Sequence, residues 1–187
     1  MPGAQPDTSS DRPTLAVAWR GRQACAGDRA LLAERLVNLN LDLLLAAQHR
    51  RAWKALALLE RLHREHGELA IGRAFAAASA DAVWDQCFRA DWSGAMRTLA
   101  QLRAIHGQWC DCETGTALAS ALFHLASVRW GTDRQAANDQ VVEELRDLLA
   151  GNGDLGTARY LGMVLADAVL FGSAQDAWRQ VEAALEE

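Results

Sequence analysis

The sequence predicts an all-α protein built from about four helical hairpins stacked in series. The first observation is an internal repeat, because AWKALALLERLHREHG at residues 52–67 is similar to DWSGAMRTLAQLRAIHG at residues 91–107. Aligning the two stretches sets Gly67 on Gly107, an interval of 40 residues (107 − 67). A period near this length is typical of stacked helical hairpins. The second observation is that no segment alternates apolar and polar residues over more than about six positions, as a strand would.

Composition excludes several functional classes. The chain has 187 residues, of which 50% are hydrophobic, enough for one ordinary core. Its 24 acidic and 19 basic side chains are scattered, so we expect no nucleic-acid partner. The N-terminus lacks a secretory signal, no run is long and apolar enough for a membrane span, and four cysteines are too few for a disulfide framework. We therefore expect a soluble, cytoplasmic protein.

Residues 1–27 are expected to form a flexible tail that precedes a single repeat domain of residues 28–187. The first 13 residues contain all three prolines together with Gly, Ser, Thr, Gln and Asp. Such a composition cannot bury enough apolar surface to offset the entropy lost on ordering. The segment 14–19 fits either a strand-like arm or a first helical turn.

The first hairpin is predicted over residues 28–67. Leucines recur at spacings of three and four from Asp28 to Gln48, which is the period of one helix face. Asp28 is expected to be the N-cap of this helix. A polar corner at residues 48–51 then leads to a helix that begins near Trp53 and ends at Gly67, because glycine suits the left-handed conformation of helix ends.

Three further hairpins are predicted with the same plan. Gly107 is expected to end the second hairpin and Gly151-Asn152-Gly153 the third. Because Gly153 follows Gly107 by 46 residues (153 − 107), the third unit is expected to have gained six residues, near positions 130–137. The predicted helix pairs cover residues 68–88 and 92–106, 111–130 and 133–150, and 154–171 and 174–187.

No catalytic pattern is present, so we expect a protein that is not an enzyme. The sequence lacks a Gly-x-Ser-x-Gly elbow, a glycine-rich phosphate loop and a His-Glu-x-x-His pair. His106, Cys110 and Cys112 resemble part of a zinc site, with Cys87 nearby, but Cys-x-Cys is tighter than the usual ligand spacing and a fourth ligand is missing. His66 holds the same repeat position as His106 without adjacent cysteines. We therefore expect no metal and no cofactor.

Each predicted unit resembles the tetratricopeptide (TPR) hairpin. Small and large apolar residues occupy the first helix, and a corner such as Ala90-Asp91-Trp92 is followed by Ala and Leu at fixed distances. The period is longer than that of TPR units and the closing proline is absent. Over about Leu36–Leu145, the stretches LVNLNLDLLLAAQHRRAWKALALLERL, FRADWSGAMRTLAQL, GQWCDCETGTALASALFHLA and AANDQVVEEL are similar to the small TPR-like proteins of bacterial type III secretion systems, of the Hrp family and the needle-subunit chaperone type.

This resemblance implies a non-enzymatic scaffold or chaperone that holds an amphipathic helix of a secretion component in a concave apolar groove. The resemblance also implies that first helices line the groove, and placing Arg50, Ala90 and Gly131 in common register then selects positions on them. The predicted partner-binding residues are Asn40, Leu44, Ala47, Ala77, Ala80, Trp84, Leu118, Ala121 and Leu125. This row is mostly apolar, with Trp84 as the expected central contact.

Two alternatives stay open. The fourth unit or a second copy of the chain, as in a homo-oligomer, could cover the apolar row instead of a partner protein. The protein could also be a ligand-sensing or metal-binding helical domain, which would need a closed pocket with convergent polar groups.

Overall fold

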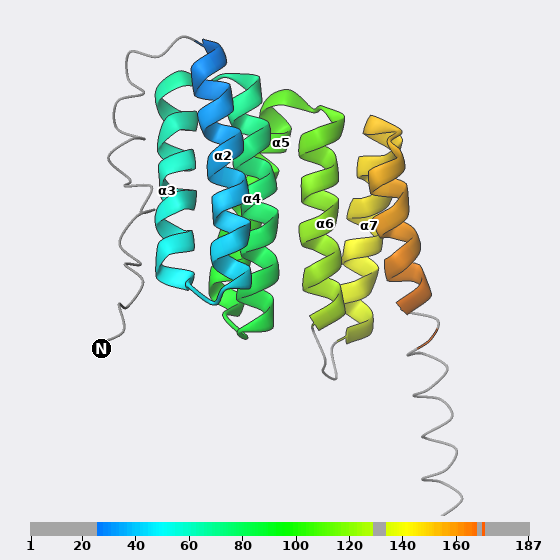
Figure 1. Cartoon of the computed structure of the whole chain (residues 1–187). Coiled ribbons are helices and arrows are strands. Elements are labelled where there is room, and N and C mark those ends of the chain that lie inside the picture. Colours follow the sequence, from blue (N-terminus) through cyan, green and yellow to red (C-terminus); the bar gives the residue numbers. More distant parts are fainter. Residues whose placement is uncertain (1–25, 129–133, 168–169, 171–187) are drawn as a thin grey trace, which may run out of the picture.

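The computed structural model describes residues 26–128, 134–167 and 170, and every element in this part of the chain is an α-helix. The all-α class is therefore confirmed for these residues. A helical segment at residues 155–167 follows the six labelled helices (Figure 1). These are α2 (Ala26–Leu45), α3 (His49–His66), α4 (Leu69–Phe88), α5 (Trp92–Trp109), α6 (Cys112–Val128) and α7 (Arg134–Asn152).

Two predicted segments fall largely outside the described residues. The predicted flexible tail covers residues 1–27, of which only the last two are described, and these belong to α2. The second helix of the fourth hairpin, residues 174–187, also lies outside. Asp28 is not an N-cap as predicted, because α2 already includes Ala26 and Asp28 lies in its first described turn.

The helices form two layers (Figure 1). α2, α4 and α6 pack on one another in series, while α3, α5 and α7 each pack on the helix that precedes them in the chain. α4 contacts helices on several sides, α2, α3, α5 and α6 among them. That agrees with its many alanines, which let neighbouring backbones approach closely. No described helix is long and apolar enough to cross a lipid bilayer.

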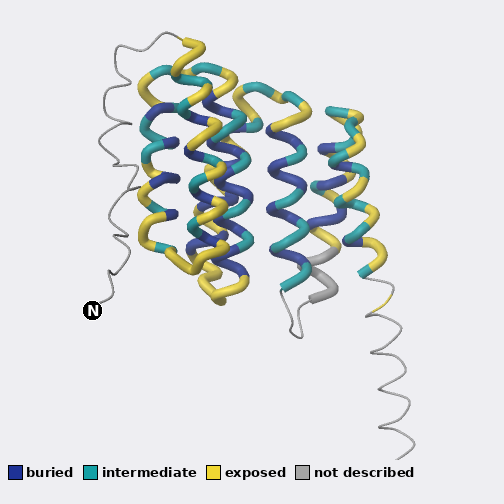
Figure 2. The backbone as a smooth tube through the Cα atoms, in the orientation of Figure 1, coloured by how far each residue is buried: buried dark blue, intermediate teal, exposed yellow. Residues whose placement is uncertain are grey.

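The core runs between the two layers. Figure 2 shows the buried positions along the inward sides of neighbouring helices. Leu59, Leu102 and Leu145 occupy the middle of α3, α5 and α7, and each is completely buried. Burying a leucine side chain stabilises the fold by roughly 1.5–3 kcal/mol, so this row contributes substantially to stability.

The described helices repeat at an interval of 43 residues, and the predicted intervals of 40 and 46 are wrong. Gly67, Cys110 and Gly153 directly follow α3, α5 and α7, and each has a left-handed backbone, with φ of 59°, 49° and 63°. They are evenly spaced (110 − 67 and 153 − 110, both 43). Each backbone N–H donates to a carbonyl four residues earlier, at 2.6–2.8 Å. Two equal intervals account for the whole span, so the third unit has gained no residues.

Gly107 does not end its helix, contrary to the prediction, whereas Gly67 does. α5 continues to Trp109, and the left-handed residue after it is Cys110. The cause is Asp111, which caps the start of α6: its carboxylate accepts from the backbone N–H of Glu113 at 3.0 Å. The turn between the helices must therefore lie directly before Asp111, and α5 extends up to it.

The corners between first and second helices repeat at the same interval. Ala47 and Ala90 both have positive φ, 54° and 57°, and the next residue in each corner, Gln48 or Asp91, donates its N–H to a carbonyl five residues earlier at 2.8 Å. This is the hydrogen-bond pattern of a Schellman motif. The predicted corner residue Arg50 instead lies inside α3.

A polar contact links consecutive first helices. Arg29 Nε donates to Glu68 Oε1 at 2.7 Å, and Arg73 Nε donates to Asp111 Oδ1 at 3.1 Å. Thr116 Oγ1 donates to Asp154 Oδ1 at 2.9 Å, which is the equivalent of the Arg73–Asp111 contact in the next hairpin. The acidic residue directly before a first helix thus bonds to a side chain of the preceding first helix and holds the two helices together.

Candidate functional site

Most of the predicted partner-binding residues lie in the core. Ala77 and Trp84 are half-buried, and Ala47 is exposed in the left-handed corner after α2. The other six face the interior, because core-facing and surface-facing apolar residues lie within one turn of each other on these helices and apolar character alone does not separate them. A partner cannot contact these six in this conformation: Asn40, Leu44, Ala80, Leu118, Ala121 and Leu125 are buried.

A groove lies along the first helices, next to the predicted row. It has a volume of about 480 Å³. On α4 its lining residues follow the i, i+3, i+4, i+7 pattern of one helix side. The groove is lined by Ala30, Leu31, Glu34, Val37 and Asn38 of α2, by Ala70, Arg73, Ala74 and Ala77 of α4, and by Glu113 of α6. We call this side of α2, α4 and α6, continued to the ends of the helices, the first-helix face.

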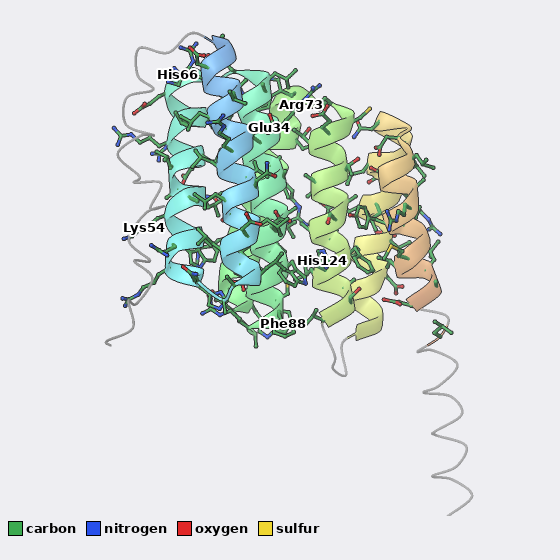
Figure 3. All side chains as sticks on the ribbon, in the orientation of Figure 1. Glu34, Lys54, His66, Arg73, Phe88 and His124 are labelled. Carbon is green, nitrogen blue, oxygen red and sulfur yellow. The ribbon has the colours of Figure 1, made fainter. Side chains whose placement is uncertain are left out.

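One end of the first-helix face is charged and internally paired. Arg73 Nη1 donates to Glu113 Oε1 at 3.0 Å, and its Nε donates to Asp111. Burial opposes ionisation of Asp111, but hydrogen bonds from the Thr114 hydroxyl and from backbone N–H groups, with Arg73 beside them, outweigh burial and lower the pKa of Asp111. Figure 3 shows Glu34 and Arg73 near this end of the helices.

The opposite end of the face is apolar and open to solvent. Leu45 is 67% exposed and Phe88 is 77% exposed, at the C-terminal ends of α2 and α4. Trp84 stacks on Phe88 with ring centroids 6.4 Å apart, and Leu41 is also exposed. Leu41 and Leu45 precede Trp84 and Phe88 by the repeat interval, so the four residues form matching i, i+4 pairs on neighbouring helices. We call these four residues the apolar patch.

Polar residues cross the middle of the face. Asn38, Asp81 and His124 hold equivalent positions on α2, α4 and α6 at the repeat interval. Burial raises the pKa of Asp81 to about 6 and lowers the pKa of His124. His124 is therefore neutral near pH 7, and Asp81 is the principal charge in this middle section.

The sequence predicted Trp84 and Ala77 on this face but not Leu41, Leu45, Asp81 and Phe88. Leu45 and Phe88 could have been found from their spacing, since each ends a first helix directly before an equivalent corner. Asp81 could have been found as a charged residue within the Ala-rich run of α4.

His106, Cys110, Cys112 and Cys87 do not converge on a common point in the structure. His106 Nδ1 lies 3.0 Å from Thr114 Oγ1, and Cys110 and Cys112 are exposed. Cys87, which the sequence placed nearby, is buried in α4. Among the described residues, no group of three or more His, Cys, Asp or Glu side chains is placed to hold a metal ion.

Comparisons with protein-family models, with curated proteins and with solved structures gave no match to this chain. The first-helix face is therefore the basis of the functional proposal.

Proposed function

We propose that this protein is a non-enzymatic scaffold or chaperone of TPR-like hairpins, and that it binds an amphipathic helix of a partner protein along the first-helix face. The observation that carries the proposal is the apolar patch at one end of the groove. A phenylalanine with 77% of its surface exposed is stacked on a tryptophan, and exposed leucines hold the equivalent positions on α2. This apolar surface gains hydrophobic stabilisation only when a partner covers it.

The shape of the groove favours a helix as the bound element. Its floor on α4 is formed by Ala70, Ala74 and Ala77, whose small side chains let another backbone approach closely. A helix laid along this floor would bring its own i, i+3, i+4 and i+7 side chains to the groove and to the apolar patch. Aromatic residues such as Trp84 and Phe88 are the residue types that contribute most in such contacts.

The sequence resemblance to the small TPR-like proteins of type III secretion systems would make a secretion component the partner, in the bacterial cytoplasm. This part of the proposal depends on the residue pattern of Leu36–Leu145 alone. A second copy of the chain is the other candidate to cover the apolar patch, and the oligomeric state of the purified protein distinguishes the two.

The test uses a variant of the apolar patch and a matched control. Leu45→Ser with Phe88→Ser removes exposed apolar surface from the patch, while Met96→Ser removes it from α5, where Met96 is 43% exposed. Partners captured from the native host are identified and then titrated against each purified variant. We expect the patch variant to lose at least about tenfold in affinity and the control to keep it, at unchanged helicity.

Equal binding by all three proteins would refute the proposal. A wild-type dimer that the patch variant converts to monomer, with no other captured protein, would replace the partner with a second copy.

A further inference from the structure

The chemistry of the first-helix face indicates what kind of helix it accepts. Resting on the proposed function, we infer that the partner is a basic amphipathic helix, one of whose Lys or Arg side chains pairs with Asp81 while its apolar side covers the apolar patch.

Asp81 differs from the other carboxylates of the described chain. Each other buried or half-buried carboxylate among those residues has a hydrogen-bond or ion-pair partner, as Asp85 has in His49 and Glu144 has in Arg103. Asp81 is half-buried and has no hydrogen-bond or ion-pair partner among the described residues. A carboxylate partly removed from water without a partner is unfavourable, and this partial burial raises the pKa of Asp81.

The described part of the chain offers Asp81 no cation. His124, at the equivalent position on α6, is held neutral by burial, and Arg73 is already bound by Asp111 and Glu113. Glu34, in the groove on α2, is exposed and also lacks an ion-pair partner among the described residues. The unpaired charges of the face are therefore both negative, and the complementary occupant is positively charged.

The neighbours of Asp81 suit a long cationic side chain. Ala77 and Trp84 flank it on one side of α4 at i−4 and i+3, as helix geometry requires. The small Ala77 leaves room for an aliphatic stem, and the Trp84 ring offers a flat surface for methylene groups or a guanidinium. One turn further on, Phe88 provides the apolar contact. A single helix with a basic and an apolar residue about two turns apart could reach both Asp81 and Phe88.

The experiment uses two labelled synthetic helical peptides of about 18 residues with the same apolar pattern. One places lysine and the other glutamate at the polar positions, and binding is followed by fluorescence anisotropy. We expect the leucine–lysine peptide to bind and Asp81→Asn to raise its Kd about tenfold, which corresponds to one charge-assisted hydrogen bond. Glu143→Gln removes the same charge from the exposed surface of α7 and is the matched control.

Three outcomes would overturn the inference. The leucine–glutamate peptide could bind as tightly as the leucine–lysine peptide, the leucine–lysine peptide could fail to bind, or Glu143→Gln could weaken binding as much as Asp81→Asn does. The last outcome would mean that only net charge matters.

Phe88→Ala distinguishes this inference from the proposed function. Loss of the leucine–lysine peptide on Phe88→Ala but not on Asp81→Asn would retain the helix-binding face and reject the basic anchor. If neither Phe88→Ala nor Asp81→Asn changes peptide binding, and the patch variant captures partners as the wild type does, the inference and the proposed function are both rejected.

Discussion

Replacing Gly67 and Gly107, which the sequence repeat superimposes, is expected to change stability in opposite directions. Gly67 follows α3 in a left-handed conformation, with φ of 59°, and its N–H donates to the His63 carbonyl at 2.8 Å. Gly107 lies within α5, and a Cβ built on it would meet no atom within 4 Å. One residue is a helix cap and the other is an ordinary helical position.

The magnitudes follow from these two backbones. An L-residue in the left-handed region costs roughly 1–2 kcal/mol, so Gly67→Ala should lower the free energy of unfolding by about that amount. Alanine is better than glycine in a helix interior by about 0.8–1 kcal/mol, so Gly107→Ala should raise it. At about 2–4 °C per kcal/mol for a chain of this size, the two Tm values should differ by about 5–10 °C.

Urea and thermal unfolding followed by far-ultraviolet circular dichroism measure both changes. Gly151→Ala, at another helical glycine with no atom near its Cβ position, is the control and should behave like Gly107→Ala. If Gly107→Ala destabilises the protein as much as Gly67→Ala, the two glycines are equivalent caps and the interval of 43 residues is refuted.

Three further predictions test the repeat register, the helix packing and the open face. Cys110→Gly should raise the free energy of unfolding by about 1 kcal/mol, because glycine adopts the positive φ of 49° without strain; urea unfolding under reducing conditions measures this. Gly72→Ala should lower it by about 1–3 kcal/mol, since the new Cβ would lie 2.0 Å from Cζ3 of Trp109, whereas Gly115→Ala meets a flexible amide and should cost less in the same assay. Burial raises the pKa of Asp81 from 3.8 to about 6, so the folded state binds this proton more tightly than the unfolded state and loses stability as pH rises through that window. Asp81→Asn should therefore gain stability relative to wild type between about pH 4 and about pH 7, and an equal difference at both pH values would contradict the burial of the carboxylate.

Helix periodicity predicted the all-α class and some helix bounds well where glycine and corner signals agreed with it. The bounds of α4 were predicted to within one residue, and Gly67 and Gly153 both follow helix ends. These positions could be predicted from the sequence because apolar residues recur at spacings of three and four over whole helices. Each further recurrence strengthens the prediction of a helix.

The repeat interval was mispredicted because glycine was used as the marker of a helix end. Cys110 has the left-handed conformation that Gly67 and Gly153 have, and no residue preference reveals this in a cysteine. A better marker was present in the capping pairs. Asp111 and Thr114, like Asp154 and Thr157, form an Asp-x-x-Thr cap in which the carboxylate accepts from the threonine hydroxyl and N–H, and the two caps are separated by the true interval.

The error in the site has a different physical origin. On α2 the predicted Leu44 is buried while its neighbour Leu45 is 67% exposed, and one residue turns the side chain by about 100° around the helix. Both are leucines, so hydrophobicity alone cannot separate a core position from an apolar surface position beside it. A surface position can be told from a core position in the sequence only where it carries a residue that is not apolar. On α4 that residue is Asp81, whose charge within an alanine-rich helix marks the open side and places Ala77 and Trp84 on it. Charge alone does not mark this side, because Asp85 of the same helix is buried beside His49. Asp81, which has no partner among the described residues, therefore marks the exposed side of α4 better than the apolar row does.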